Sequence, residues 1–292
     1  MPYPCSPYGL RALILLLQDQ ACFLARCGYV GLVVDHYKET KDFKYADRNP
    51  CRNFDNDKLQ TPLSPADLSS DQRAAARRHL RGAFDQMHGL LQAPTFWRGL
   101  MSTFLATARE HPSVHPDKAA AIGYCFGGQA CLEQVRAGDK LDAIVTFHGL
   151  LHSRPAYRDE TNPRGWGERI TQEDYLATIE QAPNHYNKDC KVLIENGDLD
   201  HSVPIEGIEI WKQEMNEQGI DWRFNNHART PHGFALAPGV WGSAYQELAD
   251  RRSTLSMLSL FAEVWPEWPQ YAVPCNACGT VLGQSIQTAA KL

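Results

Sequence analysis

Residues 121–128 read AIGYCFGG, and this stretch decides the fold class. Its apolar start is typical of a buried strand and a helical pattern follows Cys125, so the stretch predicts a strand that turns sharply into a helix. A nucleophile on such a strained turn needs small residues two places before and after it, because backbone and neighbouring strands approach closely there. Gly123 and Gly127 fill those places. The pattern predicts a nucleophile elbow; a buried structural cysteine in a glycine-rich turn is the alternative.

The predicted turn also sets the chemistry of the thiol. It lifts the Cys125 sulfur above the sheet to the positive end of a helix that begins at Phe126, where a thiolate is stabilised. The backbone N–H of Phe126 is then an expected oxyanion donor. Gly128 is expected to complete the elbow.

Further apolar runs alternate with helical patterns along the chain. This alternation predicts βαβ units, and hence an α/β fold with a mostly parallel sheet and helices on both faces. The expected strands are Tyr29–Asp35, Ala119–Tyr124, Leu141–Phe147, Lys191–Glu195 and Trp222–Asn226, and the expected helices are roughly Ser70–Leu91, Phe126–Ala137, Glu206–Gln218 and Ala244–Val264. We expect Tyr29–Asp35 to be buried on both faces of the sheet.

A base and an acid follow the predicted nucleophile in the chain order that α/β-hydrolases use. After the strand at Lys191, a loop of turn-forming residues carries Asp198 and Asp200; we favour Asp200 as the residue that orients the base, and Asp198 as a solvated or helix-capping residue. After the next strand, His232 lies beside Gly233 on the loop before the last helix, which singles it out as the base. For His227, His148 and His201 we expect no special role.

Composition excludes several classes of function. The chain has 43% hydrophobic and 22% charged residues and a formal charge of −5, with no basic block, so nucleic acid is not an expected partner. No apolar run approaches the length of a membrane span. The nine cysteines form no even framework, which favours reduced thiols and a cytoplasmic protein.

One domain over residues 1–268 is expected, followed by a poorly ordered tail over 269–292. Polar, proline-containing segments at Lys38–Leu68 and Ser153–Asn187 are expected to be surface loops. Cys275 and Cys278 form a C-x-x-C pair, but no two further ligands follow, so we expect no metal. Neither a P-loop nor G-x-G-x-x-G is present, so we expect no nucleotide cofactor.

Several of these segments resemble the dienelactone hydrolase family of α/β-hydrolases, over about Gly9 to Trp265. The matching text is GYCFGG at Gly123–Gly128, FHGLL at Phe147–Leu151, GDLDHSVP at Gly197–Pro204, EM and GIDW within Glu214–Trp222, PHGFA at Pro231–Ala235 and ARCGYVGLVVDHY at Ala25–Tyr37. The resemblance implies a Cys125–His232–Asp200 triad that hydrolyses a small ester or lactone, as in carboxymethylenebutenolidase. The implied route is an acyl-enzyme, with no cofactor or metal.

Two departures from the family pattern matter. Family members begin with strands before the helix that leads to GYV (residues 28–30 here), and the loop after the last of these strands supplies a second oxyanion donor. In this sequence only residues 1–8 precede Gly9, so we expect these strands to be missing. An impaired or inactive member acting as a scaffold or interaction protein is therefore the alternative function. Family members that open dienelactone hold its carboxylate with arginines, one shortly after the catalytic histidine, and Leu236 and its neighbours offer none, so dienelactone itself is not the expected substrate.

Overall fold

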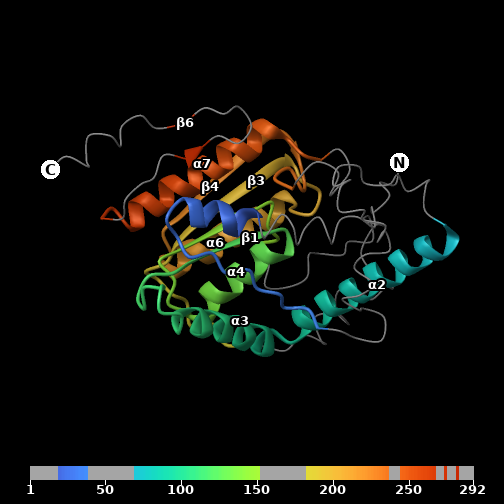
Figure 1. Ribbon diagram of the computed structural model, residues 1–292, viewed down its shortest axis with the longest axis horizontal. Helices are drawn as coiled ribbons and strands as arrows, with labels where there is room; N and C mark the ends of the chain where they lie inside the picture. The colour runs from blue at the N-terminus through green and yellow to red at the C-terminus, as the bar shows by residue number, and fades with distance from the viewer. Residues whose placement is uncertain are drawn as a thin grey trace.

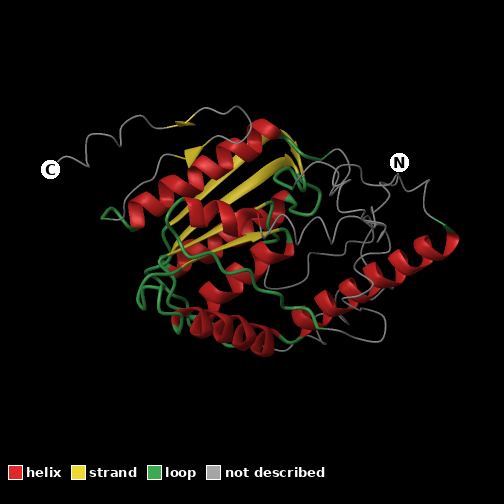
Figure 2. Ribbon diagram, viewed as in Figure 1, coloured by secondary structure: helices red, strands yellow, loops and turns green. Residues whose placement is uncertain are grey.

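The computed structural model describes residues 19–38, 69–151, 182–236, 244–267, 273–274 and 281–282. Its centre is a four-stranded parallel sheet in the order β1-β2-β3-β4 (Figures 1 and 2). The strands are β1 (Ala120–Tyr124), β2 (Ala143–Phe147), β3 (Lys191–Leu199) and β4 (Trp222–Pro231). Parallel neighbours require crossover connections. The predicted α/β class with a parallel sheet is therefore confirmed.

Helices cover both faces of this sheet. The helices that flank it are α4 (Phe126–Ala137), α6 (Ile205–Gln218) and α7 (Glu247–Val264). Every residue of β2 is buried, because Val145 and Phe147 face one apolar cluster with α7 while Ile144 faces another with α4 and α6. A helix over residues 19–26 lies on the α7 side, where Phe23 packs against the same cluster. The apolar runs of the sequence thus form strands buried on both faces.

Two further helices follow each other along the chain, α2 (Ser70–Gln92) and α3 (Pro94–Arg109). In Figure 1, α3 lies below α4, and α2 extends to the right from beside α3. Trp97 and Met101 of α3 pack against Phe126 and Ala130 of α4. The sequence patterns did not predict α3. Pro94 at its first turn and the i, i+4 spacing of Trp97 and Met101 are the signals that were available.

A buried ion-pair network joins α3, α4 and α6. The Arg136 guanidinium is fully buried, and its Nη1 and Nε donate to Glu133 Oε1 (2.9 Å) and Glu214 Oε1 (2.6 Å). Its Nη2 donates to the carbonyl of Leu151 (3.0 Å), and Arg98 Nε reaches Glu133 Oε2 at 2.7 Å. Buried charges of this kind require mutual pairing, because each one loses its hydration. The network fixes α4, which begins at the predicted nucleophile.

The predicted strand Tyr29–Asp35 is wrong. Residues 29–38 contain no strand, and no described strand pairs with them. Val30 and Leu32 are 54% and 56% exposed instead of buried on both faces. Backbone groups of a strand need a neighbouring strand as hydrogen-bond partner, and β-branched composition alone does not supply one.

The other predicted elements exist, with changed ends. β3 and β4 extend four and five residues beyond their predicted ends at Glu195 and Asn226. The surface-loop predictions lie outside the described residues except at 38 and 182–187, which have no helix or strand. The tail prediction also lies outside them, apart from the antiparallel pair β5 (Val273–Pro274) and β6 (Val281–Leu282). In the described part of the chain no helix combines the length and apolar character needed to cross a membrane.

Candidate active site

Cys125 lies on a strained turn between β1 and α4. Its backbone has φ 53° and ψ −119°, in the left-handed half of conformational space that a non-glycine residue rarely adopts. Such a conformation costs about 1–3 kcal/mol and persists only where the surroundings enforce it. Here Cys125 N–H donates to the Phe147 carbonyl (3.1 Å), and the Cys125 carbonyl accepts from Gly128 N–H (3.0 Å). The turn leaves the side chain of Cys125 partly exposed at the first turn of α4.

The three elbow glycines differ in the room that they leave for a side chain. A Cβ at Gly123 would lie 2.1 Å from the Gly127 carbonyl oxygen, and one at Gly128 would lie 2.7 Å from the Gly149 Cα, so neither site has room. Gly127 lies within α4, and a Cβ there would meet nothing within 4 Å beyond its chain neighbours and the nearby backbone of its own helix. Close approach of the backbone therefore excludes a side chain at Gly123 and Gly128, while Gly127, for which the same was expected, has room for one.

The register of β3 and β4 places Asp200 beside His232. The two strands pair regularly up to Gly197↔His227, and an irregularity follows that brings Leu199 opposite Pro231. Asp200 and His232 are the next residue on each strand. A Cβ at Gly197 would lie 2.3 Å from the Thr230 carbonyl oxygen, so the close approach of the strands depends on this glycine.

Three predicted site residues form one hydrogen-bonded chain. His232 Nδ1 lies 2.8 Å from Asp200 Oδ2, and His232 Nε2 lies 3.2 Å from Cys125 Sγ. The other carboxylate oxygen of Asp200 accepts from Ser202 N–H (2.8 Å), which holds the carboxylate in place. Asp198, in contrast, accepts from Asn226 Nδ2 (3.0 Å) at the exposed end of the sheet. The imidazole therefore bridges a buried carboxylate and a thiol.

The electrostatics of the site favour a protonated His232. Burial acts to lower the pKa of His232, but the charge of Cys125 and the hydrogen bond and charge of Asp200 outweigh it and raise that pKa to about 10. The first N–H groups of α4 have no acceptor within the helix, and the positive end of the helix adds to the stabilisation of a thiolate.

His148 is a component of the site for which the sequence patterns predicted no role. It follows β2 with φ 41°, it is fully buried, and its ring centroid lies 5.0 Å from that of His232. Neither ring nitrogen has a hydrogen-bond partner among the described residues. Burial and the neighbouring charge of His232 lower the pKa of His148 well below its usual value, so it stays neutral. Its position after a buried strand, like that of Cys125, was the available signal.

Tyr37 also lies at the elbow. Its ring stacks on that of Phe126, with an interplanar angle of 12°, and it packs in the cluster that includes Cys125. Burial, followed by the charges of Cys125 and Asp35, raises the pKa of Tyr37, so the phenol keeps its proton.

No metal centre accompanies this site in the part of the chain that the structure describes. Those residues contain no group of three or more His, Cys, Asp or Glu side chains arranged to hold a metal ion. Cys275 and Cys278 lie outside the described residues.

Comparison with known proteins decides the family. The sequence profile of the dienelactone hydrolase family matches residues 9–265. The chain belongs to this family. Among its relatives, an uncharacterised protein of Caenorhabditis elegans is 25% identical over 161 residues, which cover 53% of this chain and 85% of the relative.

Two solved structures of the family type are similar to this chain. The protein m3DLH is 31% identical, with a TM-score of 0.46 and coverage of 68% of this chain and 70% of that one. A dienelactone hydrolase-like promiscuous phosphotriesterase from metagenomic libraries is 29% identical, with a TM-score of 0.47 and coverage of 62% of this chain and 66% of that one. This chain therefore covers slightly less than two thirds of the phosphotriesterase.

Proposed function

We propose that the protein hydrolyses small carboxylic esters or lactones, with Cys125 as nucleophile, His232 as base and Asp200 as the residue that orients the base. The observation that carries the proposal is the continuous hydrogen-bond chain from Cys125 Sγ through His232 to Asp200. Family membership supports the class of reaction. The strained backbone of Cys125 supports it independently, because strain of this kind collects at functional sites.

In the first half of the reaction His232 Nε2 holds the proton of Cys125, and the thiolate attacks the substrate carbonyl carbon. A C–S bond forms and the carbonyl electron pair moves to oxygen, where the N–H of Phe126 donates to the oxyanion. The oxyanion then re-forms the carbonyl, the C–O bond to the alcohol breaks, and the alkoxide takes the proton from His232. The products are a thioester at Cys125 and a free alcohol; in a lactone both remain in one molecule.

In the second half a water molecule gives a proton to His232 Nε2 and attacks the thioester carbonyl. The C–S bond breaks, the carboxylic acid leaves, and the thiolate is restored beside the protonated His232. Asp200 stays ionised throughout and fixes the imidazole so that Nε2 faces the sulfur. His148 remains neutral beside it, so the positive charge resides on His232. The thiol returns to its starting state without any redox step.

The test is hydrolysis of 4-nitrophenyl acetate together with mass spectrometry of the acylated protein. Cys125→Ala and His232→Gln should each lower kcat/KM by about 1,000-fold or more, since the loss of one member of a catalytic triad disables the other two. Acetyl should accumulate on the peptide that contains Cys125. Cys22→Ser is the matched control, because Cys22 is an exposed free cysteine far along the chain from the site. Equal activity of all variants, or acylation that persists in Cys125→Ala, would contradict the proposal and leave the scaffold alternative.

A further inference from the structure

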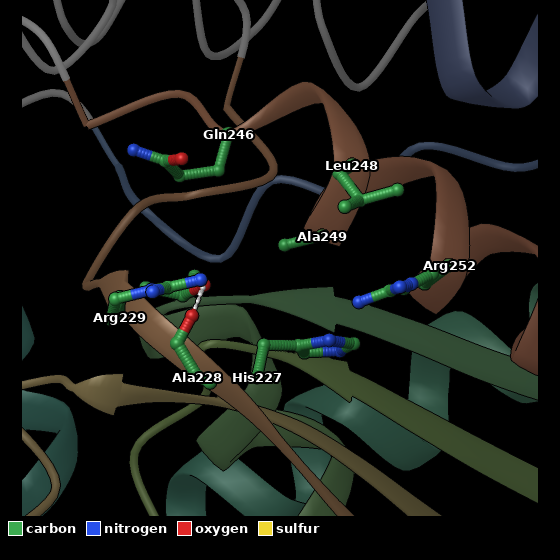
Figure 3. Close-up of a pocket in the computed structure, with 8 residues that line it drawn as sticks. His227, Ala228, Arg229, Gln246, Leu248, Ala249 and Arg252 are labelled. Atoms are coloured by element: carbon green, nitrogen blue, oxygen red, sulfur yellow. Dashed lines mark hydrogen bonds between the residues drawn. The ribbon is translucent and has the colours of Figure 1, made fainter.

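A recess lies between the end of β4 and the start of α7 (Figure 3). Its volume is about 210 Å³, and its polar lining comes from His227, Arg229, Thr230, Gln246 and Arg252. None of the three proposed catalytic residues lines it. A recess of this size is smaller than the usual site of a drug-sized ligand and has room for about seven water-sized groups, at about 30 Å³ each.

The recess carries an excess of positive charge. Figure 3 shows the side chains of Arg229 and Arg252 reaching toward each other across it, one from β4 and one from α7. In the described part of the chain neither guanidinium forms an ion pair, whereas Arg98, Arg136 and Arg223 all do. This is unusual in a protein with a formal charge of −5, in which carboxylates outnumber cationic side chains.

His227 lines the recess with its ring held by a buried carboxylate. Its Nε2 lies 2.6 Å from Oε2 of Glu195, a carboxylate with no exposed surface, and Asn225 donates to the other carboxylate oxygen (2.7 Å). Glu195 is buried behind the ring, where its carboxylate is bonded to His227 and Asn225, and it does not line the recess. Arg229 and Arg252 do line it.

The start of α7 contributes a third positive element. Leu248 and Ala249 line the recess from the first turn of the helix, whose N-terminal residue Gln246 makes no side-chain capping bond. The first N–H groups of a helix lack internal acceptors and carry partial positive charge. The nearest acidic side chains along α7, Glu247 and Asp250, are not part of the lining. Asp250 is bonded to Tyr245 instead.

Arg229 is held in place by its backbone. Its φ of 57° is in the left-handed region, which a residue with a Cβ adopts at some cost. Thr230 turns inward at this point, and its hydroxyl donates to the Ala228 carbonyl (3.1 Å), as the dashed line in Figure 3 shows. This backbone turn follows the strand irregularity that also positions His232.

We propose that this recess is a binding site for a compact oxyanion, a carboxylate or phosphate group of a small molecule, held by Arg229, Arg252 and the first turn of α7. Guanidinium groups pair with both kinds of oxyanion through parallel N–H···O bonds. The size of the recess limits the bound portion to the anionic group and its immediate neighbours. The proposal does not depend on the function of Cys125.

The test is titration of the full-length protein with sodium phosphate, and separately with sodium acetate, at constant ionic strength set with sodium chloride. Binding is followed by calorimetry and by the rise in melting temperature that a ligand of the folded state produces. We expect saturable binding, weakened about tenfold in each of Arg229→Ala and Arg252→Ala, since each removes a charge-assisted hydrogen bond. Stronger binding of phosphate than acetate would identify a phosphate site; the reverse order would identify a carboxylate site.

Two control variants distinguish binding in the recess from general attraction to surface charge and from binding at Cys125. Arg251→Ala removes the same charge from the neighbouring position of α7, outside the recess, and should change affinity less than twofold. Cys125→Ser should bind like the wild type, whether or not Cys125 is catalytic. Absence of saturable binding to either anion, equal weakening by Arg251→Ala, or loss of binding in Cys125→Ser would each overturn the proposal. Melting curves without anion verify that the variants are folded.

Discussion

Replacement of Arg136 by methionine tests the buried ion-pair network that supports the elbow helix. The guanidinium of Arg136 has no exposed surface and pairs with Glu133 and Glu214. Methionine fills much of the same volume but leaves both carboxylates without this partner. Breaking a buried pair by removing one member costs about 3–5 kcal/mol.

The structure places the expected cost at the lower end of that range. After the substitution Glu133 keeps Arg98 at 2.7 Å, and Glu214, whose side chain is 22% exposed, keeps the Tyr186 hydroxyl at 2.7 Å. The Leu151 carbonyl loses its donor, and the two carboxylates now repel each other. We therefore expect the free energy of unfolding to fall by about 3 kcal/mol, a large part of the stability of an ordinary domain.

The assay is urea unfolding followed by far-ultraviolet circular dichroism, with the slope against urea compared between variants. The matched control is Arg223→Met, which breaks the exposed pair with Glu263 and should cost less than about 1 kcal/mol. A loss below about 1 kcal/mol for Arg136→Met, or equal losses for the two variants, would refute the view that burial makes the network essential.

Three further predictions concern the site itself. Gly123→Ala should lower the free energy of unfolding by about 3 kcal/mol or more, because its Cβ would meet a backbone oxygen at 2.1 Å. Gly127→Ala should instead raise the free energy of unfolding by about 0.5–1 kcal/mol. Urea unfolding measures both values, and equal effects would contradict the elbow geometry. Cys125→Ser removes the thiolate charge and so should lower the pKa of His232 from about 10 toward its ordinary value, as followed by NMR titration of the ring protons. The raised pKa stabilises the fold fully below the ordinary value near 6.5, and this contribution is lost as pH rises to about 10. In Cys125→Ser the loss should be smaller and complete at a lower pH; an unchanged His232 titration would show that the sulfur carries no charge beside it. His148→Phe should raise the free energy of unfolding by about 1 kcal/mol, because it replaces a buried imidazole whose nitrogens have no hydrogen-bond partner among the described residues. A fall in the free energy of unfolding, measured with urea, would instead reveal a partner for that ring.

The exposed segment at Val30 and Leu32 shows where composition misleads. Its residues have the same β-branched, apolar character as β2, yet β2 is buried at every position and Val30 and Leu32 are about half exposed. The difference is the neighbour: β2 pairs with β1 and β3, while no described strand pairs with residues 29–35. Apolar composition reports the tendency of a segment to be buried, but pairing is decided by other parts of the chain.

Local pattern was sufficient for much of the fold. A strand that leads into G-x-C-x-G-G and then a helix is a property of eight consecutive residues, so the turn at Cys125 was predictable from short-range sterics. The chain order of Cys125, Asp200 and His232 was likewise visible, because the carboxyl ends of parallel strands lie at one edge of a sheet.

Contacts between distant residues were decided only by the tertiary structure. The irregular pairing after Gly197 brings Asp200 beside His232, and no local pattern encodes the register of two strands joined through a helix. The burial of His148 against His232 and the meeting of Arg229 with Arg252 across one recess depend on how α7 and the strands pack. A sequence states which side chains are available at each turn of the chain. Which of them share a cavity, and which charges lose their water, follows only when the separate elements are packed together.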